Sequence, residues 1–529
     1  RSREHAVSWR STRAAGEGGQ RNRQVAVVDL GSNSWRLVVF TFSPPPGPWW
    51  KLTDELYETV RIGAGLAASG KLSYEAIGRG LETLGVFARF CRANHLDAED
   101  VHVVATSAIR DAANGERFLA DAQAATGLTI ETLSAHDEAF YGYVAAVNTT
   151  TLTDGVVLDI GGGSMQLTHV AGRRAHQSAS FPLGAVRVTE QFLPGDGPVK
   201  KKDLSKLRDH ISAKVSALEW LASSGRRMVG VGGAVRNLAA AAQAANGSLD
   251  LGVQGFVITP KVLSDLTSEL AAMSAQERGM VPGIKPGRGD IILASAVVLD
   301  TVVSLGGFDG IEATDAGLRE GVFLARTLLD GDPPLFDDVR GAAVRNLAVQ
   351  YESDIAHVEH VAKLSLQMFD SLVSGGLFTP AEGERELLWA ASMLHDVGMA
   401  ISYDDHHKHS RYLIESAELP GFDPRERALI AQITRYHRKG IPKLGIIEAI
   451  AHPGDEQVLD RGAVILRLAE HLERGRDQSV SEARLDTNGD GVDLHLKAGG
   501  DLTLPRWSVE RYGDDEAFER VFDRRLLIG

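Results

Sequence analysis

Short apolar runs and longer amphipathic stretches alternate along the first 330 residues. Runs such as 101–106 and 156–158 have the length and the β-branched composition of buried strands. The stretch 72–94 instead places apolar residues at every third or fourth position, as a helix does. From residue 335 onward this helical spacing predominates, for example over 358–368 and 387–394. The pattern predicts an α/β part followed by a helical part.

Two stretches of the α/β part share the frame Asp-x-Gly-x-x-Ser. The first runs from Asp29 to Ser34 and the second from Asp159 to Ser164, each directly after an apolar strand. Glycine turns leave backbone amides free to surround phosphate oxygens, the Ser hydroxyl adds a contact, and the Asp can hold a hydrated Mg²⁺. The repeat therefore predicts two duplicated halves, with a cleft between them that grips a phosphate chain and a metal ion.

Two charged residues near the ends of predicted strands or helices are further candidates for the functional site. Arg110 follows a strand, and its forked guanidinium suits either a phosphate or a surface ion pair with Asp111. Ser134 begins a helix, and Glu138 lies in its first turn. An acid there can complement the helix dipole or act as a general base, and the periodicity leaves both roles open.

Two other glycine turns differ in what they predict. The segment 226–237 indicates a strand, a turn at Gly232 and Gly233, and a helix whose N-terminus can bind an anion. Its spacing is not that of a dinucleotide fingerprint, so NAD is not predicted. The segment 486–491 resembles the start of a calcium loop, but its twelfth position is Lys497 rather than Glu. We interpret it as a β-turn.

The helical part carries several residues that can bind metals. They are His360, the adjacent pair His395-Asp396, His409, His437 and Glu470. This order resembles that of HD-type phosphohydrolases, which hold metals between helices, although those proteins prefer Asp at the last position. A second metal site at His360, His395, Asp396 and Glu470 is one interpretation. Histidines that are simply hydrogen-bonded or exposed to solvent are the other.

The breaks in the pattern divide the chain into four segments. We interpret residues 1–23 as a disordered tail, because they are polar and have no periodicity. Residues 24–147 and 148–330 form the two halves of the α/β part. The Gly- and Pro-rich turn that follows separates them from an all-α domain over 335–529.

Composition narrows the classes of function. The net charge of −14 argues against a general nucleic-acid binder, although local amides and Mg²⁺ can still bind a polyanion. A single cysteine, Cys91, excludes intrachain disulfides and is best explained as a small buried residue. No run has the length of a membrane helix, and no apolar signal segment is seen, so we expect a cytoplasmic protein without membrane contact.

The chain resembles the exopolyphosphatase and guanosine pentaphosphate phosphatase family, of the actin, sugar kinase and Hsp70 superfamily. The resemblance begins near Val25 and continues to the C-terminus. It is carried by motifs at 27–34, 60–63, 105–110, 137–139, 158–164, 315–321, 393–398 and 435–439. The last two motifs are similar to those of the long members, which add an HD-like helical domain. The resemblance implies a duplicated actin-like fold with the active site in its cleft.

The resemblance also implies roles for residues of the motifs. Glu138 is expected to be the base that activates water and, with Asp159, to be catalytic. Asp29, Asp159 and Glu138 are expected to hold Mg²⁺, with a monovalent cation such as K⁺ as a further cofactor. Substrate contacts are expected from Ser32, Asn33, Ser34, Arg61, Thr106, Arg110, Gly161, Gly162, Gly163, Ser164, Gly232 and Gly233. The chain has Gln166 where relatives often have Glu. This difference is expected to alter metal affinity or rate.

The function expected from these features is Mg²⁺-dependent removal of the terminal phosphate from inorganic polyphosphate. Hydrolysis of guanosine pentaphosphate by the same machinery is the nearest alternative, because no residue distinguishes the two substrates. An ATP-dependent kinase of the same superfamily is a second alternative, and a guanosine-nucleotide sensor with a weakened site is a third. We expect a homodimer.

Overall fold

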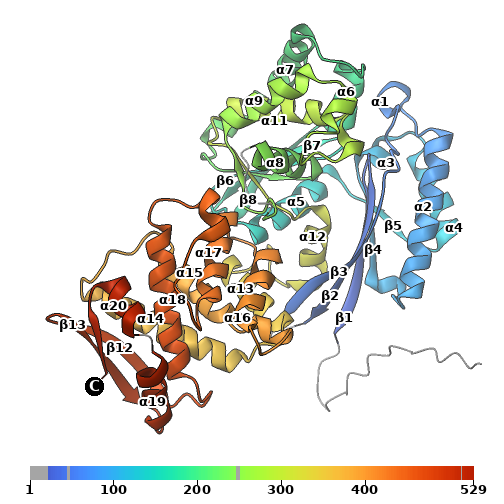
Figure 1. Ribbon diagram of the computed structural model, residues 1–529. Coiled ribbons are helices and arrows are strands. Elements are labelled where there is room, and N and C mark those ends of the chain that lie inside the picture. Colours follow the sequence, from blue (N-terminus) through green and yellow to red (C-terminus); the bar gives the residue numbers. More distant parts are fainter. Residues whose placement is uncertain (1–21, 45–47, 246–250, 514, 529) are drawn as a thin grey trace, which may run out of the picture.

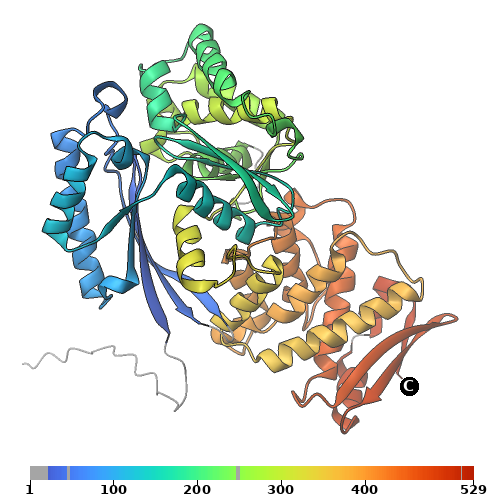
Figure 2. The same cartoon turned by 180° about the vertical axis from the view of Figure 1, so that it is seen from behind.

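The computed structural model describes residues 22–44, 48–245, 251–513 and 515–528 (Figure 1 and Figure 2). Residues 1–21 of the predicted tail lie outside the described residues. Its last residue, Arg23, already belongs to the first strand. Among the described residues, no helix combines the length and the apolar character that crossing a membrane requires.

The first half is built on a mixed five-stranded sheet of order β3-β2-β1-β4-β5. Its strands are β1 (Arg23–Leu30), β2 (Trp35–Ser43), β3 (Trp49–Glu58), β4 (Val101–Ala105) and β5 (Ile130–Thr132). Strands β1 and β4 run parallel at the centre and are almost wholly buried where they pair, as their continuous apolar runs predict. The helices α2 (Tyr74–Ala93) and α4 (Gly115–Thr126) cover one face of this sheet (Figure 1).

The second half repeats this topology. Its sheet has the order β10-β11-β9-β6-β7-β8, and the path β8-β7-β6-β9-β11 matches β3-β2-β1-β4-β5. The strands are β6 (Gly155–Ile160), β7 (Met165–Ala171), β8 (Arg174–Phe181), β9 (Met228–Val231), β10 (Val257–Ile258) and β11 (Ile311–Ala313). Helices α6 (Ala185–Phe192), α7 (Lys201–Val215), α8 (Gly233–Ala245), α9 (Pro260–Ala272) and α11 (Ile292–Gly306) belong to this half. The duplication predicted from the two hairpins is confirmed, and the topology agrees with the actin-like fold that the resemblance implies.

Two helices lie between the sheets and join the halves. Helix α5 (Ala135–Thr149) packs against β6, β7 and β8, while α12 (Leu318–Phe323) packs against α5 and β1. Both are visible between the sheets in Figure 1 and Figure 2. The predicted boundary between residues 147 and 148 falls inside α5, two residues before its end. Apolar residues from both sheets form one core around these helices, among them Val27, Phe40 and Val229.

The C-terminal part is helical, as predicted, but it is not all-α. Its main helices are α13 (Val339–Gln350), α14 (Ile355–Ser374), α15 (Glu384–Leu394), α16 (His406–Ser416), α17 (Pro424–Arg435) and α18 (Asp455–Leu472). A sheet of β12 (Val480–Asn488), β13 (Gly491–Ala498) and β14 (Arg525–Ile528) follows, with α19 (Thr503–Tyr512) and α20 (Asp515–Phe522). The tight turn between β12 and β13 contains Gly489, so the interpretation of 486–491 as a β-turn is confirmed.

Candidate active site

A polar cleft lies between the two halves of the α/β part. It has about 970 Å³ of space and is open to solvent. Both predicted hairpin loops, the turn before α8 and the start of α12 line it. Among the lining residues are Asp29, Ser32, Asn33, Ser34, Thr106, Glu138, Asp159, Gly161, Gly162, Ser164, Gly232 and Gly233. Twelve of the residues predicted from the motifs are therefore brought together at one place.

The absence of side chains on glycine allows the elements of the cleft to come this close. A Cβ atom on Gly162 would lie 2.9 Å from the Cβ of Ser32, so the two hairpin loops touch across the cleft. A Cβ on Gly142, one turn after Glu138 on α5, would lie 3.1 Å from Asp159 Oδ2. Gly232 has a φ of +106°, which favours glycine and turns the chain from β9 into α8.

Three carboxylates, those of Asp29, Glu138 and Asp159, line the cleft. Burial raises the pKa of Asp29, although Arg319 and Arg36 oppose this. Burial, then the neighbouring Glu138 and Asp29, raises the pKa of Asp159 to about 7. Because the three groups disfavour each other's ionised form, a divalent cation among them would relieve the repulsion. Hard oxygen ligands of this kind suit Mg²⁺, so the residues present fit the predicted metal.

Glu138 is held by three polar side chains. Arg110 Nη1 donates to Glu138 Oε1 at 2.5 Å. Glu138 Oε2 accepts from Gln166 Nε2 at 2.7 Å and from Ser164 Oγ at 3.2 Å. Burial raises the pKa of this carboxyl, while Arg110 and Ser164 lower it. A carboxylate oriented in this way, and biased toward a higher pKa than an exposed Glu, has the properties of a general base.

The cleft is also lined by four arginines that the motifs did not identify as ligands. They are Arg36, Arg236, Arg288 and Arg319. Burial and the nearby Arg319 lower the pKa of Arg236 to about 10, and burial lowers the pKa of Arg288. Arg319 is 8% exposed, and its Nε has no hydrogen-bond partner among the described residues. Buried cations with unused donors favour an anionic ligand, since guanidinium forks match phosphate oxygens.

Three predicted substrate contacts are not part of the cleft wall. Arg61 forms an ion pair of 2.9 Å with Asp290 outside the cleft, and Arg110 turns to Glu138 and Asp111 instead of the open space. Gly163 packs behind the loop, where a Cβ would lie 2.4 Å from Ser107 Oγ. In this structure Arg110 holds Glu138 and Gly163 permits loop packing, and neither residue lines the cleft.

In the C-terminal part, the structure brings together His395, Asp396 and Glu470 but not His360. The Nε2 atom of His360 lies 2.8 Å from the carbonyl oxygen of Val480, next to β12 rather than within the cluster. His357, one turn earlier on α14, occupies the predicted place at 3.3 Å from Glu470. Similarly, His406 rather than His409 lies beside His437.

Comparison with known proteins matches the chain to two sequence models of one family. The sequence model of the Ppx/GppA phosphatase family matches residues 51–329, and that of Ppx/GppA phosphatase domain III matches residues 339–504. A protein of Vibrio vulnificus named guanosine-5'-triphosphate,3'-diphosphate pyrophosphatase is 27% identical over 478 residues, which are 89% of this chain and 92% of that protein. A protein of the same name from Aliivibrio fischeri is 26% identical over 494 residues, covering 92% and 95% of the two chains.

Solved structures agree on the fold. The crystal structure of an exopolyphosphatase from Cytophaga hutchinsonii covers 57% of this chain and 97% of its own, with a TM-score of 0.52 and 20% identity. That of an exopolyphosphatase-like protein covers 57% and 96%, with a TM-score of 0.51 and 24% identity. At these identities the likeness shows the fold alone.

Proposed function

The chain belongs to the Ppx/GppA phosphatase family and is a phosphoanhydride hydrolase, and from this premise we propose that it removes the terminal phosphate of inorganic polyphosphate in the presence of Mg²⁺. One observation carries the proposal. Four arginines and three carboxylates line the same cleft, together with two glycine loops. A chain of phosphates with a bound dication complements both sets of charges.

The proposed roles of the residues follow from their contacts. Glu138 accepts the proton of a water molecule as the water oxygen attacks the terminal phosphorus. The bond from phosphorus to the bridging oxygen breaks, and the products are orthophosphate and a chain that is one phosphate shorter. Mg²⁺ held by Asp29 and Asp159 would neutralise charge on the phosphate oxygens. Arg110 and Gln166 hold Glu138 in place through the hydrogen bonds described above.

The loops and arginines position the substrate. Amides of the two hairpin loops and of the first turn of α8 can hold the terminal phosphoryl group, because these segments line the cleft and glycine turns and helix N-termini are suited to binding anions. Arg236, Arg288 and Arg319 can bind the phosphates that follow. Fixed donors around a phosphoryl group supply most of the catalysis in reactions of this type.

Guanosine pentaphosphate is the second candidate substrate. The names of the Vibrio and Aliivibrio relatives favour it, since the similarity runs through nearly the whole length of both. Its 5' end is also a phosphate chain, so the same residues would act on its terminal phosphate.

The experiment that tests the proposal is release of orthophosphate with Mg²⁺, measured side by side on long-chain polyphosphate and guanosine pentaphosphate. We expect a higher kcat/KM on polyphosphate. A higher value on guanosine pentaphosphate would favour the second candidate. Tight nucleotide binding without release from either compound would contradict both and favour a sensor.

A further inference from the structure

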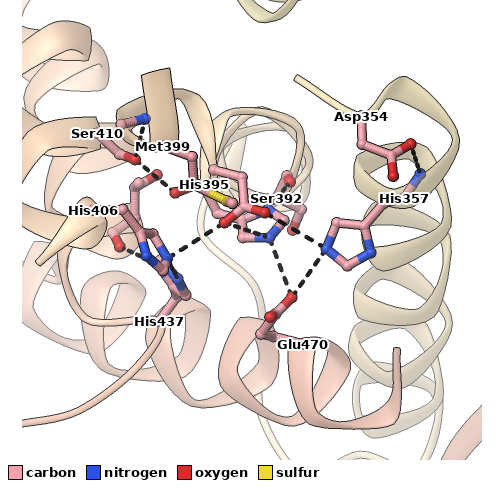
Figure 3. A network of polar contacts seen from close by, with 12 residues as sticks. Asp354, His357, Ser392, His395, Met399, His406, Ser410, His437 and Glu470 are labelled. Carbon is pink, nitrogen blue, oxygen red and sulfur yellow. Dashed lines mark hydrogen bonds and ion pairs between the residues drawn. The ribbon is translucent and has the colours of Figure 1, made fainter. Parts of the chain in front are cut away.

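Six polar side chains meet inside the C-terminal helical domain, far along the chain from the cleft residues. His357 comes from α14, His395 and Asp396 follow α15, and His406 comes from α16 (Figure 3). His437 follows α17, and Glu470 belongs to α18. The four histidines and Asp396 are each at most 5% exposed. Buried groups of this kind need a compensating partner, because burial without one costs several kcal/mol.

The hydrogen bonds of three histidines fix which ring nitrogen faces the centre. The Nδ1 atoms of His395, His406 and His437 lie 2.7, 3.0 and 2.7 Å from backbone carbonyl oxygens three residues earlier in the chain. A carbonyl oxygen only accepts, so each Nδ1 carries the proton and donates it. Each Nε2 is therefore the ring atom left to bind a metal ion at the centre. This is the arrangement that supports histidine ligands in metal sites.

The inward atoms are spaced like ligands around shared ions. His395 Nε2 and His357 Nε2 lie 3.2 and 3.3 Å from Glu470 Oε2. His406 Nε2 lies 3.3 Å from Asp396 Oδ1 and 3.1 Å from His437 Nε2. Two ligands at about 2.1 Å from one ion, at angles of about 90–109°, lie roughly 3.0–3.4 Å apart. These four separations fall in this range, and Asp396 Oδ1 lies slightly farther from His395 Nε2, at 3.5 Å.

The contact between His406 and His437 is unfavourable without a cation between the two rings. Both Nε2 atoms present lone pairs to each other, since both Nδ1 atoms hold their protons on carbonyls. Close by, His357 Nε2 and His395 Nε2 both face Glu470 Oε2, at 3.3 and 3.2 Å, and each could bind a cation together with that oxygen. Cations at these positions would satisfy all five atoms at once.

We propose that this cluster binds a pair of divalent first-row transition-metal ions that share Asp396. His357, His395, Asp396 and Glu470 form the first subsite, and Asp396, His406 and His437 form the second. Four imidazoles with two carboxylates favour Mn²⁺, Fe²⁺, Co²⁺ or Zn²⁺ over Mg²⁺, which prefers oxygen ligands. The site is separate from the cleft in its residues and in the metal it takes.

A solvent-open space leads to the shared carboxylate. It measures about 980 Å³ and is lined by residues 350–354, Asp396, Met399, Ala400 and Arg476. Arg476 donates to Asp396 Oδ2 at 2.5 Å, and this oxygen also lies 3.8 Å from His357 Nε2. The guanidinium, which is about one third exposed, must swing outward when Oδ2 binds an ion. The space gives ions an entry path, which an assembled metal site requires.

The test is the metal content of the full chain, purified without chelators and measured by inductively coupled plasma mass spectrometry. We expect about two transition-metal ions per chain, retained in Glu138→Gln because that change lies in the cleft. Asp396→Asn should lose both ions and His406→Gln one. His409→Gln is the matched control, because His409 lies on α16 with His406 but is partly exposed and outside the cluster.

A second measurement keeps the test independent of whether the variants fold. The native chain is stripped with chelator and titrated with Mn²⁺, and electron paramagnetic resonance is recorded at two equivalents. A spin-coupled Mn²⁺ pair is expected, because both ions contact one carboxylate. No uptake of Mn²⁺ or Zn²⁺ by the native chain would overturn the proposal. So would metal content that Asp396→Asn leaves unchanged in a folded variant.

Discussion

Gln166 offers a direct test of how the proposed base is held. Its Nε2 donates to Glu138 Oε2 at 2.7 Å and to Ser164 Oγ at 3.0 Å, and the side chain is 3% exposed. Leu has nearly the same volume and no donor. The substitution Gln166→Leu therefore removes the amide contact to the carboxylate without opening a large cavity.

The size of the effect follows from the charge on the acceptor. A hydrogen bond to an ionised group contributes about 1.5–3 kcal/mol, which corresponds to roughly 10- to 150-fold in an equilibrium. The amide donates more strongly to ionised Glu138 than to the protonated acid, and only ionised Glu138 can act as the base, so losing the amide favours the inactive, protonated form. Burial already raises the pKa of this group, and the substitution adds to that shift in the same direction.

The assay is the pH dependence of kcat/KM for phosphate release with saturating Mg²⁺. In Gln166→Leu the acidic limb should move to higher pH, with a loss of about tenfold or more on the acidic side and partial recovery on the alkaline side. Thr168→Val is the control, because Thr168 is buried on the same strand but does not line the cleft. An acidic limb at the same pH as in the native protein would refute the role assigned to Gln166.

Two further predictions concern charged residues of the cleft. Arg319→Gln should lower kcat/KM by about 10- to 150-fold and weaken the salt dependence of kcat/KM, because a charge-assisted contact to phosphate is lost. The control, Arg226→Gln, changes an exposed arginine outside the cleft and should alter neither quantity. Equal effects of the two substitutions would contradict the prediction. Asp159→Asn should abolish turnover yet raise Tm by a few degrees at pH 7.5 in EDTA. The folded protein binds the Asp159 proton more tightly than the unfolded chain, whose ordinary pKa is 3.8, so this group lowers stability progressively as pH rises to about 7. A lower Tm in the variant would contradict this.

The fold was predictable because local patterns repeat. The frame of Asp29 and its counterpart at Asp159 predicted duplication, and each strand's apolar run predicted its burial. The third C-terminal strand, β14, was missed. It pairs with β13 although helices α19 and α20 separate the two in the chain, and the pairing depends on tertiary contacts that no local period reports.

The arginines of the cleft were missed for a related reason. Arg236, Arg288 and Arg319 each lie near a glycine motif that the sequence made visible, but the three are far apart along the chain. Only the folded second half brings them to one cleft. Arg110 shows the reverse case, since its charge suited phosphate but its nearest partner in space is Glu138. Sequence identified the residue types, and packing decided their roles.

The cluster of histidines shows how much the phase of a helix matters. His357 and His360 are three residues apart on α14, so both lie near one face, and the sequence alone cannot choose between them. The cap at Asp354, whose side chain accepts from His357 N, fixes where the helix begins. With that phase, His357 faces Glu470 while His360 meets the carbonyl oxygen of Val480.

The most direct test of the account is phosphate release from long-chain polyphosphate by Glu138→Gln. The substitution removes the proposed base and keeps the shape, so kcat should fall by about 10²- to 10⁴-fold while the Mg²⁺-dependent binding of polyphosphate persists. Glu116→Gln is the matched control, because Glu116 is also a first-turn helix acid but is exposed and outside the cleft. Turnover by Glu138→Gln at the rate of the native protein would contradict the assignment of the base and, with it, the proposed mechanism.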